Sequence, residues 1–390
     1  MPTIELRDVT KTGPKDAVLL DGINVTIEDG QSLAIVGPPH AGKSLLLRIL
    51  VGLDELSDGD ILIDGSLVNA VGPRDRDFAM VFQDFEVYPH LNVFDNMAFS
   101  VKLRKGYKKS ELADRIAEVA ELLGLAERLD AQPANLSESE RQRVALGRVL
   151  VRDATAYLFD DPFSTLDDRA RSHVRSMTSQ WQRAFGRTSV YVTNDISEAL
   201  SLGDKVAVLH QGFVHQCASP RDLYDHPVDM FVASLVGSPP MNLIPARVRG
   251  GSLELPFTTL PLGDEMRRRV GDQDLVIVGI RPEDCTNSAS HDPESLKGKI
   301  SFSTKVDEVE WRGSSQYAYL DFDMDEDTES ALQEIEEHIE FDLFQSHLLA
   351  SIGPESHVKA GTFIRLVINP VKVHLFDAIS GANLTLVGDN

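Results

Sequence analysis

The N-terminal part of the chain alternates apolar and polar positions in short segments. Residues 4–9 and 23–27 follow this spacing, which places apolar side chains on one face of an extended chain. Successive side chains of a strand point to opposite faces, so the spacing predicts two half-buried strands. Residues 61–63, bounded by glycines, are predicted to form an edge strand or one arm of a hairpin.

Continuous apolar runs follow, and helical patterns separate them. The run at 33–36 precedes apolar residues that recur at helical spacing over 45–50. Such runs predict buried strands, and strands that alternate with helices predict a parallel sheet. Further runs lie at 77–83, 156–160, 188–193 and 205–209.

Residues 84–150 are predicted to be mainly helical. Apolar residues recur at 112, 116, 119 and 123, with Ser110 before them and Gly124 after them. Serine can cap a helix and glycine commonly ends one, so a helix is predicted between these two residues. A second helix is predicted from about Ser137 to about residue 150.

The pattern changes again near residue 236, after which short alternating segments predict a small all-β barrel. The predicted strands lie at 242–248, 275–280, 299–306, 317–322, 363–368 and 371–376. The prediction is therefore an α/β domain over residues 1–235, with a helical subdomain at about 84–150, and a β-barrel domain over residues 236–390.

Composition and charge exclude several classes of partner and site. The net charge is −23, which argues against DNA, RNA or anionic lipid as a direct partner. Residues 321–342 are rich in Asp and Glu and are predicted to be a solvated face or loop. No signal region or membrane-length apolar segment occurs, so a soluble protein is expected, with any membrane role through a partner. Cys217 and Cys285 match no metal or redox spacing and are interpreted as reduced, buried thiols.

The candidate chemistry begins where the run at 33–36 ends. Gly37, Gly42, Lys43 and Ser44 match the phosphate-loop pattern G-x-x-x-x-G-K-[ST], between a predicted strand and a predicted helix. Backbone N–H groups of such a loop face an anion, the lysine reaches the outer phosphates and the serine ligates Mg²⁺. The predicted nucleotide contacts are Gly37, Pro38, Pro39, His40, Ala41, Gly42, Lys43, Ser44 and Leu45.

Further motifs follow in a characteristic order. Asp160 ends an apolar strand, where a carboxylate can hold Mg²⁺, and Asp161 follows directly. Together with Gln83, the segments 136–143 and 164–167 and the Asn194 region, the chain resembles an ATP-binding cassette (ABC) ATPase. Segments 237–242, 279–283 and 376–383 resemble the appended TOBE/OB-like domain of maltose-, glycerol-3-phosphate- and trehalose-type sugar importers.

The resemblance implies roles for individual residues. Gln83 would sense Mg²⁺ and the attacking water, Ser44, Gln83 and Asp160 would hold Mg²⁺, and Asp161 and Asn194 would act in catalysis. Residues 164–167 would cross a dimer interface, and two subunits would each hold ATP between one P-loop and the opposite signature loop. The residues expected on the signature side are Ser137, Glu138, Ser139, Glu140 and Asp167.

The resemblance also implies partners and a location. These are two transmembrane permease subunits, a second ABC ATPase subunit and an extracytoplasmic substrate-binding protein, with the chain peripheral at the cytoplasmic face of the membrane. Phe85, Tyr88 and Pro89 would face the permease. The cofactors implied are ATP and Mg²⁺.

Several positions depart from the family pattern. The signature Leu-Ser-Gly-Gly-Gln reads Leu-Ser-Glu-Ser-Glu at 136–140, and Arg141 and Arg143 are expected to neutralise its carboxylates in part. The catalytic Glu is Asp161, which is one methylene shorter. The switch His is Asn194, which cannot carry a proton. The aromatic residue that stacks on adenine falls on Gly13, so that stacking is expected to be absent.

The resemblance implies the ATP-binding subunit of a sugar or polyol importer, and the departures predict that it binds nucleotide but hydrolyses it poorly. One alternative is a non-hydrolysing regulatory cassette that pairs with a competent second ATPase. Another is a non-transport cassette acting on ribosomes or DNA, which the single cassette and the acidic charge disfavour. A P-loop kinase is disfavoured by the signature segment. The sequence leaves open the transported substrate and the choice between homodimer and heterodimer.

Overall fold

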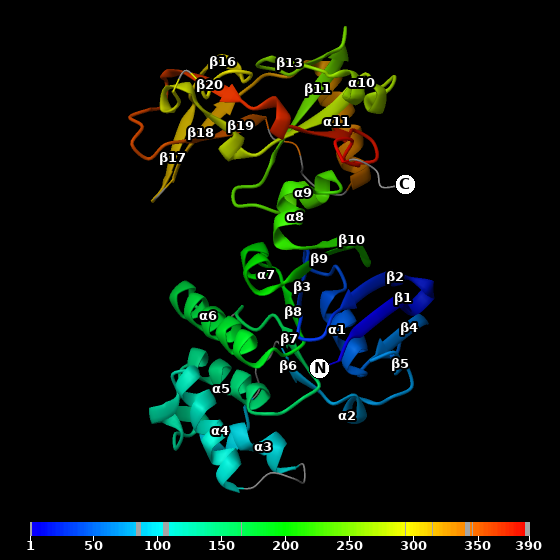
Figure 1. Ribbon diagram of the computed structural model, residues 1–390, viewed down its shortest axis with the longest axis vertical. Coiled ribbons are helices and arrows are strands. Elements are labelled where there is room, and N and C mark those ends of the chain that lie inside the picture. The colour runs from blue at the N-terminus through cyan, green and yellow to red at the C-terminus, as the bar shows by residue number, and fades with distance from the viewer. Residues whose placement is uncertain are drawn as a thin grey trace. The chain divides into compact units, whose positions relative to one another are not determined.

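The computed structural model describes residues 2–82, 87–103, 109–164, 166–292, 294–313, 315–339, 344 and 346–386. Contacts divide the chain into two compact units, 1–221 and 222–390, which are described separately (Figure 1). The domain limits predicted from the sequence, with a boundary near residue 236, stay a prediction.

A six-stranded sheet forms the centre of the N-terminal unit, in the order β10-β9-β3-β8-β7-β6. Five neighbouring strands run parallel, as predicted, whereas β10 pairs antiparallel with β9. The bounds are β3 Ser32–Val36, β6 Phe78–Val81, β7 Ala156–Asp160, β8 Ser189–Thr193, β9 Lys205–His210 and β10 Phe213–Ala218. Every residue of β3, β7 and β8 is buried, which explains their continuous apolar sequences.

A four-stranded antiparallel sheet, β2-β1-β4-β5, packs with the first sheet around α1 (Lys43–Val51). Its strands are β1 Ile4–Thr12, β2 Val18–Ile27, β4 Asp58–Ile63 and β5 Ser66–Leu67. The segment 61–63 forms one arm of a β4–β5 hairpin, as one of the two predictions had it. It is not an edge strand, because β4 also pairs with β1.

Helices fill the segment between β6 and β7 and follow the later strands. The structure has α2 Pro73–Arg76, α3 Val93–Lys102, α4 Lys109–Leu122, α5 Glu138–Leu150, α6 Asp168–Phe185 and α7 Ile196–Leu202, with single 3-10 turns at Pro14–Asp16, Ala126–Arg128 and Pro133–Asn135. Both α3 and α4 pack on α5 (Figure 1). Ser110 lies inside α4 rather than before it, because the helix already begins at Lys109, so its predicted capping role is wrong.

The C-terminal unit contains two sheets that share one core. Their orders are β13-β12-β11-β14-β21 and β16-β20-β15-β19-β18-β17. The first has β11 Asn242–Arg249, β12 Ser252–Glu254, β13 Thr259–Pro261, β14 Leu275–Ile280 and β21 His374–Asp377. The second has β15 Cys285–Asn287, β16 Ile300–Lys305, β17 Glu308–Arg312, β18 Ser315–Asp321, β19 His347–Ile352 and β20 Phe363–Ile368. The predicted strand 371–376 is shorter than expected, because a 3-10 turn occupies Pro370–Lys372.

Helices accompany these sheets, so the unit is not purely β. They are α8 Pro220–Asp225, α9 Met230–Leu235, α10 Asp264–Val270 and α11 Glu326–Ile339, with 3-10 turns at Pro282–Asp284 and Ser288–Ser290. The acidic stretch 321–342 is predicted to be a solvated face or loop. Its central part is α11, and Glu326, Asp327 and Glu329 are exposed on it, so a solvated face is present. Leu332 and Ile335 lie one turn apart and pack into a cluster with Ile277 and Phe376. This apolar stripe packs one side of α11 against the rest of the unit, although the stretch is rich in Asp and Glu.

Candidate functional site

The phosphate loop joins the buried strand β3 to the first turn of α1. A Cβ atom added to Gly37 would lie 1.9 Å from the carbonyl oxygen of Leu209, so no side chain fits there. Gly42 has a φ of 98°, and a Cβ on it would meet Leu20 at 2.8 Å. The predicted glycines are therefore required by close approach at Gly37 and by backbone conformation at Gly42.

Lys43 is held inside this loop. Its Nζ donates hydrogen bonds to the carbonyl oxygens of Gly37 at 2.9 Å and Pro38 at 2.7 Å, and the residue is buried. Burial lowers the pKa of Lys43, and the nearby carboxylates of Asp161 and Asp160 oppose this shift. The loop thus holds a cation whose partners are neutral carbonyls, which fits a site for an anion.

Ser44 and Asp160 bring two oxygen ligands together beside the loop. The Ser44 hydroxyl donates to Oδ1 of Asp160 at 2.8 Å. Burial raises the pKa of Asp160, and the hydrogen bond from Ser44 opposes this shift. A hydroxyl and a carboxylate oxygen are donors that Mg²⁺ accepts, so the pair fits that ion. Gln83, the third predicted ligand, and Phe85 lie outside the described residues.

Asp161 and Asn194 bond to each other at the ends of β7 and β8. The Asn194 amide Nδ2 donates to Oδ2 of Asp161 at 3.3 Å. Asp161 has a φ of 47°, and its backbone N–H donates to the Val192 carbonyl at 2.8 Å. Burial, followed by the neighbouring Asp160, raises the pKa of the Asp161 carboxyl. The two predicted catalytic residues are therefore adjacent.

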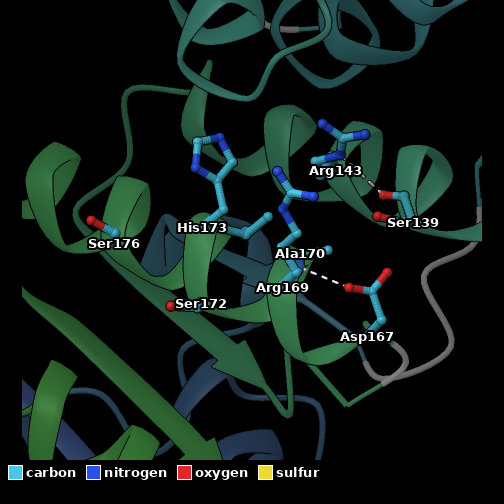
Figure 2. Close-up of a pocket in the computed structure, with 9 residues that line it drawn as sticks. Ser139, Arg143, Asp167, Arg169, Ala170, Ser172, His173 and Ser176 are labelled. Carbon is cyan, nitrogen blue, oxygen red and sulfur yellow. Dashed lines mark hydrogen bonds between the residues drawn. The ribbon is translucent and has the colours of Figure 1, made fainter.

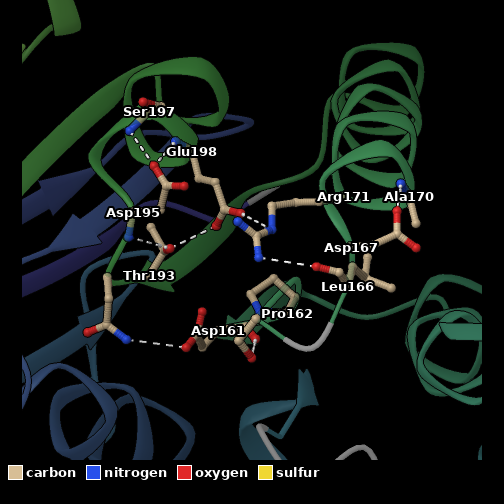
Figure 3. A network of polar contacts seen from close by, with 12 residues as sticks. Asp161, Pro162, Leu166, Asp167, Ala170, Arg171, Thr193, Asp195, Ser197 and Glu198 are labelled. Carbon is tan, nitrogen blue, oxygen red and sulfur yellow. Dashed lines mark hydrogen bonds and ion pairs between the residues drawn. The ribbon is translucent and has the colours of Figure 1, made fainter. Parts of the chain in front are cut away.

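A polar network fixes the segment after β8 (Figure 3). Thr193 Oγ1 donates to Glu198 Oε2 at 2.8 Å and accepts from the Asp195 N–H at 3.0 Å. Arg171 on α6 pairs with Glu198 at 3.7 Å and donates to the Leu166 carbonyl at 3.1 Å. Both neighbours of Asn194 are thereby anchored. The Arg171–Glu198 pair joins residues from two different helices, and the sequence pattern gave no signal for it.

The phosphate loop, the Ser44–Asp160 pair and the Asp161–Asn194 pair share one cavity of about 560 Å³. It is lined by Leu19, Pro39, His40, Gly42, Lys43, Ser44, Leu45, Asp160, Asp161, Val192 and Asn194. Most of the predicted contacts are present, whereas Gly37, Pro38 and Ala41 do not line it. Leu19 and Val192 were missed, because a leucine and a valine in apolar runs give no signal of a ligand site.

The predicted signature residues lie elsewhere, at the start of α5. Ser137 caps this helix, and its backbone N–H donates to Oε2 of Glu140 at 2.8 Å. The Ser137 hydroxyl also contacts the Glu140 carboxylate at 2.9 Å and accepts from the Glu140 N–H at 3.2 Å. The backbone donor lowers the pKa of Glu140. This is a capping box, in which a side chain of the helix satisfies its own N-terminus.

The arginine that pairs with this carboxylate was not predicted. Arg128 Nε lies 3.2 Å from Oε1 of Glu140. Arg141 donates instead to the Leu136 carbonyl, and Arg143 donates to the Leu123 carbonyl at 2.9 Å. The expectation that Arg141 and Arg143 neutralise the signature carboxylates is corrected to this extent: the direct partner is Arg128, and Arg143 acts only through the field around Glu140.

Ser139 and Asp167 border a second cavity, of about 880 Å³, whose lining residues differ from those of the first (Figure 2). Asp167 caps α6 by accepting from the Ala170 N–H at 2.9 Å. Glu138 is exposed and forms no ion pair within the described part of the chain. The structure therefore gathers the predicted residues at two places, one at the phosphate loop and one at the start of α5.

Both units of the chain match known protein families. The model of the ABC transporter family matches residues 20–164, and that of the MalK OB fold domain matches residues 237–285. The trehalose import ATP-binding protein SugC of Mycobacterium tuberculosis is 38% identical over 390 residues, covering 99% of both chains. This chain belongs to the ABC import ATP-binding proteins. Its N-terminal unit is an ABC-type ATPase domain, followed by a MalK-type OB fold domain.

Other members of this ABC family match at similar levels. The sn-glycerol-3-phosphate import ATP-binding protein UgpC of Cereibacter sphaeroides is 40% identical over 319 residues, covering 82% of this chain and 87% of the relative. A solved dimer of the cassette MJ0796, bound to ADP and phosphate after hydrolysis, has 28% identity and a TM-score of 0.51. It covers 55% of this chain and 98% of that chain. In the described residues, no helix has both the length and the apolar character needed to cross a membrane.

Proposed function

We propose that this chain is the ATP-binding subunit of a sugar or polyol importer and that its own site hydrolyses ATP slowly. The relatives named for trehalose and for sn-glycerol-3-phosphate import support the substrate class. The chain would lie at the cytoplasmic face of the membrane, against two permease subunits that receive substrate from an extracytoplasmic binding protein.

The phosphate loop supplies the nucleotide contacts in this proposal. Lys43 would exchange its two carbonyl partners for the outer phosphates of ATP, which are stronger acceptors. Ser44 and Asp160 would hold Mg²⁺, with Gln83 as a further ligand. Bound Mg²⁺ supplies charge neutralisation at the phosphates. Val192 and Leu45 would close the cavity on its apolar sides.

Slow hydrolysis rests on one observation, the bond between Asn194 and Asp161. The amide uses one acceptor site of Asp161, the carboxylate directly after the strand-ending Asp160. It adds no group that can take or release a proton, because asparagine does not titrate. Asp161 is also one methylene shorter than glutamate, and a base must lie within hydrogen-bond reach of its water. The pair is therefore a weak proton-transfer unit.

A groove beside β6 fits the proposed permease contact. It has a volume of about 560 Å³, and Phe82, Tyr88, Pro89 and Arg148 are among the residues that line it. The Arg148 guanidinium lies 4.4 Å from the centre of the Tyr88 ring. This pair places an aromatic ring and a positive charge on the wall of the groove. Tyr88 and Pro89 are two of the residues that the family resemblance assigns to this contact.

A second candidate function is favoured by the closed start of α5. Glu140 occupies the Ser137 N–H and hydroxyl, which are the groups expected to bind the nucleotide of an opposing subunit. A chain with this contact could serve as a non-hydrolysing regulatory cassette beside a second, competent ABC ATPase. The proposal therefore favours a heterodimer over a homodimer.

Phosphate release by the reconstituted complex tests the proposal. Asp161→Asn is expected to slow release less than roughly threefold, whereas removal of the matching carboxylate from the partner ATPase is expected to slow it by roughly a hundredfold or more. If Asp161→Asn alone abolishes turnover, the chain is an ordinary ATPase. An isolated chain with no measurable turnover would favour the regulatory cassette.

A further inference from the structure

Leu19 borders the nucleotide cavity from outside the phosphate loop. It lies near the start of β2, and 39% of its surface is exposed, whereas the adjacent Leu20 is fully buried. Burial of an exposed leucine side chain against a ligand is favourable, because apolar surface leaves water. The residue thus offers apolar area at the rim of a cavity whose other groups are mostly polar.

The Leu19 side chain occupies the space in front of Gly13. A Cβ atom on residue 13 would lie 3.1 Å from Leu19 Cδ1, 3.3 Å from Cγ and 3.5 Å from Cδ2. Gly13 has a φ of −100° and a ψ of −166°, an extended conformation open to any residue. The three heavy atoms nearest to such a Cβ all belong to Leu19, so the two positions compete for one volume.

Leu19 and the acidic groups flank the phosphate loop on opposite sides. The carbonyl oxygen of Leu19 lies 3.1 Å from a Cβ built on Gly42 and 2.7 Å from one built on Gly212, in the turn between β9 and β10. Asp160 ends β7, which the sheet order places beyond β3 and β8 on the other side. A ligand with phosphates on the loop and a cation at Asp160 therefore has Leu19 at its far end.

We propose that Leu19 forms the platform for the nucleobase, in place of an aromatic side chain at position 13. The proposal rests on the nucleotide binding proposed above and adds how the base is recognised. An aliphatic side chain contacts a base through dispersion and burial and offers no hydrogen bond. The contact then does not discriminate between bases, so ATP and GTP bind with similar affinity. The phosphates supply most of the binding free energy.

Titrations of the full chain with Mg²⁺ and either ATP, GTP or tripolyphosphate test this platform. Leu19→Ala is expected to raise the Kd for ATP roughly three- to tenfold, because part of the buried apolar area is lost. Its Kd for tripolyphosphate, which has no base, is expected to stay unchanged. Val18→Ala is the matched control, because Val18 is 57% exposed and does not line the cavity.

The double variant Gly13→Tyr with Leu19→Ala exchanges one platform for the other. It is expected to bind ATP at least as tightly as the wild type, because a ring stacks well on a base. An unchanged ATP affinity in Leu19→Ala, an equal loss of tripolyphosphate binding, or a wild type that strongly prefers ATP over GTP would each overturn the platform. A wild type that binds neither ATP nor tripolyphosphate would instead refute the nucleotide site itself.

Discussion

The P-loop and the start of α5 each present groups that could bind a phosphate. The lysine of the P-loop bonds to carbonyls rather than to a carboxylate, so we call the P-loop the open end and the start of α5 the closed end. At the P-loop, Lys43 bonds to neutral carbonyls, which a phosphate can replace. At α5, the Ser137 donors bond to the carboxylate of Glu140, which Arg128 also holds. A helix N-terminus attracts anions. The comparison shows that a carboxylate from the same helix can occupy the place of a bound anion.

The largest expected effect is on ATP affinity, and it comes from removing the lysine of the P-loop. Lys43→Ala removes the buried ammonium of the P-loop and is expected to weaken ATP binding by at least roughly tenfold, as loss of a hydrogen bond to a charged group does. Titration calorimetry measures it, with circular dichroism to confirm the fold. Lys297→Ala is the control, since the Lys297 side chain is 73% exposed in the other unit. Equal ATP affinity in wild type and Lys43→Ala would contradict the P-loop assignment.

Restoring the family residues at positions 161 and 194 is expected to raise the rate of hydrolysis at the open end. Asp161→Glu with Asn194→His lengthens the base and replaces an amide with a titratable ring, so phosphate release by the complex is expected to rise roughly tenfold or more. Each single variant is expected to give less, because the proposed defect has two parts, the reach of the base and the missing titratable ring. A double variant no faster than wild type would show that the limit lies in the opposing signature loop.

Glu140→Gln is expected to remove the negative charge from the start of α5 while it keeps the capping contact. Glutamine still accepts from the Ser137 N–H as part of a capping box, but its charge no longer repels a phosphate. ATP-dependent association with the second ATPase subunit is expected to strengthen roughly threefold, measured by sedimentation. Glu138→Gln is the matched control, because it removes an exposed charge from the same turn. If both variants act alike, net charge rather than closure is responsible.

The smallest effect is the stability that Glu140 gives to α5. Glu140→Ala is expected to cost about 1 kcal/mol at pH 7, as loss of a capping contact does. The folded-state pKa of Glu140 is lowered, so its contribution is present above the unfolded pKa of 4.5 and is lost as pH falls through the folded value. Urea denaturation of wild type and variant between pH 7 and pH 3 should show the two curves converge. A difference that does not shrink as the pH falls would rule out the carboxylate as its source.

Much of the fold followed from local patterns. Buried strands such as β3 and β7 are continuous apolar runs, and the P-loop is defined by neighbouring residues, so both could be predicted. The acidic helix α11 could not, because charge masked an apolar stripe of few residues.

Contacts outside the regular spacing of helices and strands account for the rest of the site. Arg128 reaches Glu140 from another turn, and Leu19 reaches the space of Gly13 across a loop. Neither contact leaves a periodic trace in the sequence. The roles of Arg128 and Leu19 are therefore visible only in three dimensions.

The position of β3 inside its sheet has a consequence for how the protein is made. This strand, residues 32–36, pairs with β8 at 189–193 and with β9 at 205–210. Its partners are synthesised long after it, and such distant pairing slows folding because a long loop must close first. During translation the P-loop strand therefore stays unpaired until β8 has left the ribosome, and its second edge stays unpaired until β9 has. This interval is when the chain is most exposed to aggregation and to binding by chaperones.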